Sequence, residues 1–78
     1  MQKVLNTLNF GANLRQLRKS YGFTQERLVA HLNLKGIDIS RSKYSRYETG
    51  ELNIPLEVIK ALQEIYQCPY EKFFSDEK

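Results

Sequence analysis

Apolar residues recur at intervals of three and four along most of the chain, which is the period of one face of a helix. The first such run has apolar side chains at Phe10, Leu14, Leu17 and Tyr21. It predicts a helix over residues 10–20, which Asn9 can cap and which ends before Gly22. No segment shows the strict alternation of a strand, so the pattern indicates an all-helical protein.

Capping residues predict where the next two helices begin. Thr24 can cap a second helix, whose inner face carries Leu28, Val29 and Leu32. A connection over residues 33–39 follows, with Gly36 at its middle. Ser40 then caps a third helix, which ends at Thr49–Gly50. Ile39 and Tyr44 flank this cap at the spacing of a hydrophobic staple.

Two prolines predict the last two helices. Pro55 suits the first position of a fourth helix, and Pro69 starts a short fifth one. The inner stripe of the fourth comprises Val58, Ile59, Leu62, Ile65 and Tyr66. The fifth carries Tyr70, Phe73 and Phe74 on one side, and these rings either close the core or form a dimer surface. The N-terminal segment with Val4, Leu5 and Leu8 is a second candidate for that surface.

Residues 40–48 form two distinct faces when they are placed on a helix. Tyr44 and Tyr47 fall on one side, where they can enter a core. The opposite side collects two arginines and two small hydroxyls, at Arg41, Ser42, Ser45 and Arg46. Guanidinium forks and hydroxyls are suited to base edges and phosphates in a DNA groove. The alternative is an ordinary solvated face on an amphipathic helix.

Charge is unevenly distributed along the 78 residues. The formal net charge is +3, but residues 1–46 carry +7 and residues 47–78 carry −4. A basic half beside an acidic half is typical of proteins that bind nucleic acid. Chance segregation in a short chain and an acidic protein partner are the two alternatives.

Composition excludes several other function classes. His31 and Cys68 are the only histidine and cysteine, so the chain has no internal disulfide and no Cys/His metal cluster. Cys68 is interpreted as a packing residue, with an intermolecular disulfide as the second reading. We expect no cofactor and no enzymatic activity, because no catalytic arrangement or phosphate loop is present. Without a long apolar stretch or a signal-peptide pattern, we expect a cytoplasmic protein that does not enter membranes.

Several short motifs, taken in their order along the chain, resemble the Cro/repressor-type helix-turn-helix family of phage and bacterial regulators. The resemblance runs from about Leu14 to Phe74. The residues that carry it are Leu14-Arg15-Gln16-Leu17-Arg18, Gly22-Phe23-Thr24-Gln25-Glu26, Ser40-Arg41-Ser42, Ser45-Arg46-Tyr47-Glu48, Gly50 and Pro55. It implies a compact five-helix bundle of the lambda-repressor type. The expected domain covers residues 9–74, between an arm or short extra helix at 1–8 and a frayed tail at 75–78.

The resemblance also implies roles for individual residues. The third helix would read the DNA major groove while the second crosses the backbone. Base-reading positions of the family fall on Arg41, Ser42 and Arg46. Backbone-contacting positions fall on Gln25, Ser40 and Lys43, and Gln25 would also buttress the reading helix. The family pairs the positions of Arg18 and Glu48, and both residues border an apolar stripe here, so we expect a structural ion pair.

Two features depart from the family pattern. The turn before the third helix is about five residues longer than the usual 3–4, and Lys35 in it either reaches a phosphate or is solvated. Val29 stands where the family usually has alanine. We expect a transcriptional regulator, a repressor rather than an activator, that binds double-stranded DNA as a homodimer on a two-fold site. The alternative is a protein-interaction module, such as an antitoxin or phage factor, whose main partner is another protein.

Overall fold

Helices and short connections make up the computed structural model, which describes residues 10–74. Four α-helices follow one another: α2 (Phe10–Ser20), α3 (Gln25–Leu34), α4 (Arg41–Thr49) and α5 (Leu56–Tyr66). A 3₁₀ helix, η1 (Tyr70–Phe73), comes last. Residues 10–74 contain no strand, which confirms the all-helical prediction for this part of the chain.

The prediction of five α-helices is wrong for the described residues, because the segment after Pro69 closes only 3₁₀ turns. Lys72 donates its N–H to the Pro69 carbonyl at 3.1 Å, and Phe74 donates to Glu71 at 3.0 Å. Segments this short commonly adopt the tighter 3₁₀ form. Only Phe73 of the three aromatic residues is buried, while Tyr70 and Phe74 stay exposed. The predicted arm, its apolar residues, the Asn9 cap and the tail lie outside the described residues.

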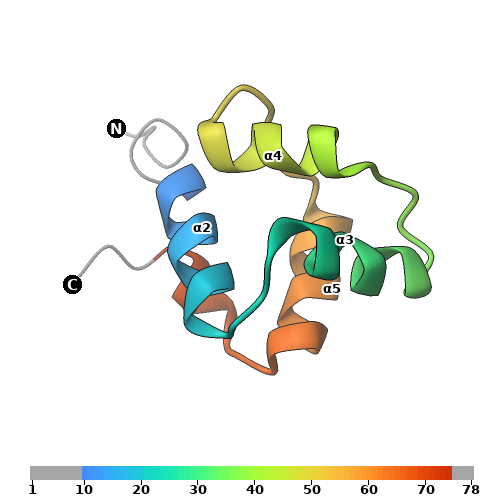
Figure 1. The fold of residues 1–78 in the computed structure, drawn as a ribbon. Coiled ribbons are helices and arrows are strands. Elements are labelled where there is room, and N and C mark those ends of the chain that lie inside the picture. The colour runs from blue at the N-terminus through green and yellow to red at the C-terminus, as the bar shows by residue number, and fades with distance from the viewer. Residues whose placement is uncertain (1–9, 75–78) are drawn as a thin grey trace.

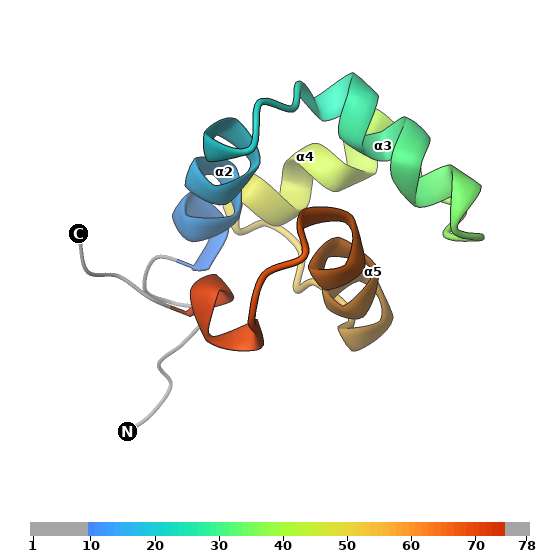
Figure 2. The ribbon, with the colours of Figure 1, turned by 90° about the horizontal axis from the view of Figure 1, so that it is seen from below.

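Helix α4 packs against both α2 and α3, and α5 packs against α3 below them in Figure 1 (Figures 1 and 2). The core lies where these helices meet, and its fully buried side chains are Tyr44, Phe73, Leu14, Leu28, Leu32, Leu62 and Val58. Tyr21, which was predicted to continue the α2 stripe, lies after the helix end. Its half-exposed ring stacks on Tyr66 with centroids 4.7 Å apart.

The predicted caps at Thr24 and Ser40 are confirmed. The Thr24 hydroxyl accepts the Arg27 N–H at 3.1 Å, and the Ser40 hydroxyl accepts the Lys43 N–H at 3.1 Å. Pro55 precedes α5 as its N-cap and is not the first helical residue, because its ψ of 153° is extended. In α5, Ala61 lies in the core, whereas Ile65 is only partly buried.

The connection between α3 and α4 begins later than predicted, because α3 continues through Leu34. Gly36 takes φ +91°, and the Ile37 N–H reaches the Leu32 carbonyl at 3.0 Å. This bond pattern closes the helix and favours glycine at the turning residue. The Asn33 side chain then donates to the carbonyls of Ile37 (2.8 Å) and Ile39 (3.2 Å). Local hydrogen bonds therefore shape the long turn that places α4.

Candidate nucleic-acid interface

Helix α4 turns its tyrosines into the core and its arginines outward. Tyr44 is fully buried and Tyr47 is 4% exposed, while Arg41, Ser42 and Arg46 are exposed. The two tyrosine rings meet edge to face, with centroids 6.1 Å apart. This packing fixes the rotation of α4 about its own axis, so its polar face is presented to solvent.

The exposed face of α4 forms a shallow hollow of about 320 Å³. Its lining combines two guanidiniums, three hydroxyls and one carboxylate. The residues that line it are Arg41, Ser42, Ser45, Arg46, Thr49 and Glu51. The structure therefore brings all three predicted base-reading residues onto one continuous surface.

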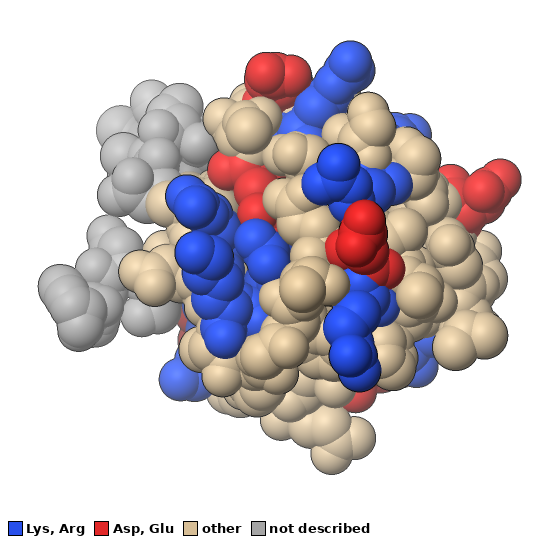
Figure 3. Space-filling model, in the orientation of Figure 1, with Lys and Arg blue, Asp and Glu red and all other residues tan. Residues whose placement is uncertain are grey.

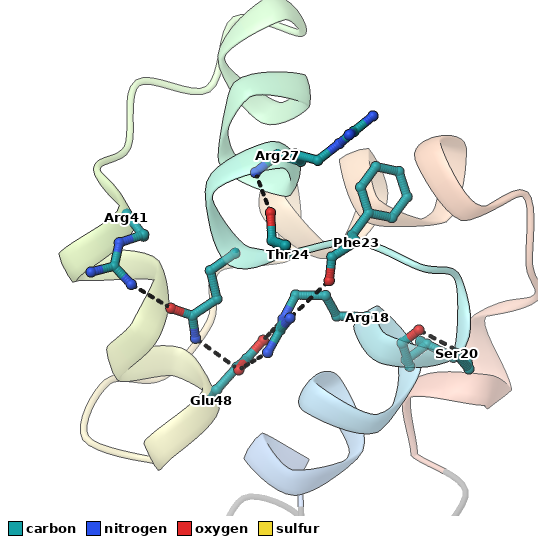
Figure 4. A network of polar contacts seen from close by, with 9 residues as sticks. Arg18, Ser20, Phe23, Thr24, Arg27, Arg41 and Glu48 are labelled. Carbon is teal, nitrogen blue, oxygen red and sulfur yellow. Dashed lines mark hydrogen bonds and ion pairs between the residues drawn. The ribbon is translucent and has the colours of Figure 1, made fainter.

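Arg18 and Glu48 form a buried ion pair with two contacts. Arg18 Nε lies 2.7 Å from Glu48 Oε2, and Arg18 Nη2 lies 3.1 Å from Oε1. The third guanidinium nitrogen donates to the Phe23 carbonyl at 2.8 Å (Figure 4). The side chains are 9% and 4% exposed. The pair thus joins α2 to α4 and to the turn before α3.

Gln25 connects this buried pair to the outer face of α4. Its amide nitrogen donates to Glu48 Oε1 at 3.0 Å. Its amide oxygen accepts from Arg41 Nη1 at 3.3 Å (Figure 4). Both contacts agree with one orientation of the amide, because its nitrogen faces a carboxylate and its oxygen faces a guanidinium. Gln25 therefore contacts α4 at the buried Glu48 and at the exposed Arg41.

The network shifts the titration of both charged groups. Burial alone would raise the pKa of Glu48, but hydrogen bonds from Arg18 and Gln25 outweigh it and the pKa is lowered. The hydrogen bond with Glu48 raises the pKa of Arg18. Glu48 is therefore ionised at neutral pH and can hold both of its partners.

The other residues predicted to contact the DNA backbone, Lys43, Ser40 and Lys35, differ in what their side chains contact. Lys43 is exposed near the start of α4, and the Ser40 hydroxyl is occupied by the cap beside it. Lys35 is turned toward α5, where its Nζ lies 2.8 Å from Glu64 Oε1. An approach to phosphate would require Lys35 to leave this exposed ion pair.

A second hollow of about 520 Å³ lies where α2 ends and α3 begins. Its cationic side chains are Lys19, Arg41 and the largely buried Arg18. The other lining residues are Gly22, Phe23, Thr24, Gln25 and Glu26. Sequence reasoning did not single out Lys19, although its place one turn after Arg15 puts both on the outer side of α2. Basic side chains gather over α2 and over α3 on this side of the molecule (Figure 3).

Gly11 is a positioning residue that sequence reasoning missed. A Cβ at this position would lie 2.9 Å from the Glu48 carbonyl carbon and 3.0 Å from the Tyr47 oxygen. The absence of a side chain therefore lets α2 lie directly against the last turn of α4. The sequence signal was an unexplained glycine inside a predicted helix, which is unfavourable unless packing requires it.

Two features of residues 10–74 concern membrane and metal binding. None of the helices within residues 10–74 has the length and apolar character needed to cross a membrane. Over the same residues, His, Cys, Asp and Glu side chains form no cluster of three or more that could hold a metal ion.

Comparison with known proteins relates most of the chain to one family. No curated protein and no solved structure gives a significant match to the chain. The family model described as a helix-turn-helix domain matches residues 9–72, which is most of the sequence. The chain therefore belongs to this helix-turn-helix family, whose paired helices are a DNA-binding unit.

Proposed function

We propose that this protein binds specific sites on double-stranded DNA and regulates transcription, with α4 in the major groove. The observation that carries the proposal is the exposed face of α4, where Arg41, Ser42 and Arg46 share one surface behind two buried tyrosines. Each arginine can donate two hydrogen bonds to guanine O6 and N7, and Ser42 can add a less selective one.

The surroundings of α4 support contacts to the DNA backbone. Gln25 and Ser40 flank the N-terminal end of α4, Lys43 lies in its first turn, and the hollow lined by Lys19 lies beside them. We assign these residues to phosphates, which would orient the domain without reading sequence. Lys35 joins them only if its ion pair with Glu64 opens. Arg18 has no part in contact, because its guanidinium is used within the fold.

The finer type that fits this arrangement is a Cro/repressor-type regulator without catalytic activity. Occupation of a groove excludes other proteins from the same site, so repression needs no surface beyond the DNA-binding one. One reading helix covers few base pairs, and useful specificity therefore favours a homodimer on a two-fold site.

A second candidate function is a protein-interaction module, and the exposed rings near η1 favour it. Tyr70 and Phe74 are 42% and 39% exposed, with centroids 5.0 Å apart. Phe74 also lies 5.2 Å from the ring of Phe10. An aromatic cluster of this kind suits a protein partner, either a second copy or an unrelated chain.

Selection of bound sites from random duplex DNA tests the proposal. Wild-type protein is compared with Arg41→Ala and Arg46→Ala, and with Lys60→Ala, which removes an exposed cation from α5. We expect a palindromic site for wild type and Lys60→Ala, with preference relaxed at different positions in the two arginine variants. Binding without any enriched site would overturn DNA reading and favour the protein-partner candidate.

A further inference from the structure

Glu51 places a carboxylate on the same surface as the proposed base-reading residues. Its Oε1 lies 3.6 Å from Arg46 Nε, and both side chains line the hollow over α4. The other charged groups that line this hollow are the guanidiniums of Arg41 and Arg46. A negative charge on a surface that meets phosphates weakens binding, so its presence calls for a specific role.

The last turn of α4 holds the backbone of Glu51 in place. Its N–H donates to Thr49 Oγ1 at 3.4 Å, and that hydroxyl donates to the Arg46 carbonyl at 3.2 Å. The Leu52 N–H donates to the same carbonyl at 3.1 Å. Gly50, with φ +86°, turns the chain between these contacts. Glu51 is thus tied to the residue with which it pairs.

The pair contributes little to the fold. Its side chains are 57% and 66% exposed, and solvent screens an ion pair that is exposed to this degree. What it can supply is orientation, because a carboxylate beside Nε restricts a flexible arginine and leaves its terminal nitrogens free. Those two nitrogens form the fork that meets O6 and N7 of guanine.

We infer that Glu51 is a specificity-determining residue that positions Arg46 for one base and lowers affinity for all other DNA. This inference rests on the proposed function and adds to it a residue that acts through Arg46. It predicts effects of opposite sign. Loss of the charge strengthens binding to DNA in general and weakens discrimination at the base that Arg46 reads.

The test uses the full chain with Glu51→Gln, Glu51→Asp, Arg46→Ala and the double variant Arg46→Ala/Glu51→Gln. Glu71→Gln, which removes the same charge from η1, is the control. Selection with wild type and Arg46→Ala first identifies the base that Arg46 reads. Duplexes with the preferred base or a substituted one are then titrated between 50 and 200 mM salt, and circular dichroism checks that each variant is folded.

For Glu51→Gln we expect tighter binding to the substituted duplex and a salt slope steeper by up to about one. Preference at the base read by Arg46 should fall about threefold to tenfold, a partial loss of one bidentate contact. Glu51→Asp keeps the charge but withdraws it from Arg46, so preference should fall while general affinity stays low. The double variant should discriminate no worse than Arg46→Ala alone.

Unchanged base preference in both Glu51 variants, with an enriched site for wild type, would overturn the inference and leave the proposed function standing. The same result follows if Glu71→Gln matches Glu51→Gln, because the effect would then be one of net charge. No enriched site for wild type overturns the proposed function, and the role of Glu51 falls with it.

Discussion

Arg18 and Glu48 are each less than one-tenth exposed, so neither charge reaches water if its partner is removed. Their contacts span 30 residues of sequence and join α2 to α4. Gln25 extends the same network to Arg41 on the outer face. At the scale of single residues, the fold and the proposed DNA surface thus share one set of hydrogen bonds, and changes within it act on both.

Replacement of Arg18 by alanine should destabilise the domain strongly. It leaves the Glu48 carboxylate buried without its cation, which typically costs about 3–5 kcal/mol. That loss is a large share of the stability of so small a domain. Urea unfolding measures it, with Arg15→Ala, an exposed arginine of the same helix, as the control. An Arg18→Ala protein that unfolds at the wild-type midpoint and only binds DNA more weakly would contradict the structural role.

Acid should destabilise the domain through Glu48. The pKa of Glu48 is lowered in the fold, so the unfolded chain binds its proton first as the pH falls. The contribution of Glu48 is complete above its unfolded pKa, which is about 4.3. It is lost as the pH falls below that value through the lower folded pKa.

Melting temperatures from pH 7 to pH 2 measure this contribution. Glu48→Gln should melt lower at pH 7 and lose less on acidification than wild type. Glu64→Gln, in the exposed pair with Lys35, should follow the wild-type curve closely, because solvent screens that pair. Parallel curves for wild type and Glu48→Gln would exclude Glu48 as the source of acid sensitivity.

At the scale of elements, the placement of α4 depends on two features that lie outside the helix itself. Gly11 lets α2 approach the carbonyls at the end of α4, and the 35–40 turn places its start. The sequence of α4 specifies its two faces, whereas its neighbours decide where those faces point. Both features can be tested by single substitutions.

Gly11→Ala should destabilise the protein, although alanine favours helices by about 1 kcal/mol over glycine. The added methyl group meets backbone atoms of Tyr47 and Glu48, and such overpacking costs about 1–3 kcal/mol. Thermal unfolding measures the change, with Gln16→Ala on the exposed side of α2 as the control. DNA affinity should fall more for Gly11→Ala than for Gln16→Ala. A raised melting temperature for Gly11→Ala would show that the approach is not tight.

Asn33→Ala should loosen the turn before α4. The amide donates to two carbonyls, and its loss should cost about 1 kcal/mol after the gain in helix propensity is subtracted. Hydrogen exchange of the Ile37 N–H, which donates to the Leu32 carbonyl in the same turn, should become faster, and urea unfolding should shift to lower concentration. Asn53→Ala, in the exposed loop before α5, is the matched control. Equal exchange rates in the two variants would mean that the turn is held by other contacts.

At the scale of the whole molecule, the sequence predicted features that form within one helix or turn better than it predicted contacts between elements. The caps at Thr24 and Ser40 depend on backbone groups within the same turn, and the burial of Tyr44 and Tyr47 follows the apolar periodicity of one helix, so the pattern indicated both. The last segment departs from the predicted fifth helix because it is only long enough for 3₁₀ turns, and the sequence left open which of its three rings are buried. Gly11 was missed because its role arises only where α2 meets the end of α4, and Glu51 was missed because apolar periodicity gives no information about exposed ion pairs.

Charge segregation at this scale leads to a final prediction about orientation on DNA. Lys19 lines the hollow beside Gln25 and Arg41, whereas Lys60 is exposed on α5 near Glu64. If DNA meets the α2–α4 side, Lys19→Gln removes one phosphate contact, and the salt slope falls by about 0.9. Lys60→Gln removes the same charge and should leave the slope unchanged.

Titration of one duplex at several salt concentrations compares these two variants with wild type. A net-charge effect would lower affinity equally for both, because long-range attraction depends weakly on where a charge sits. With a fixed docking face, the salt slopes of the two variants differ, because only a cation at a phosphate releases a counterion. Equal slopes for Lys19→Gln and Lys60→Gln would therefore contradict docking through the α2–α4 side, whatever affinity the wild-type protein has.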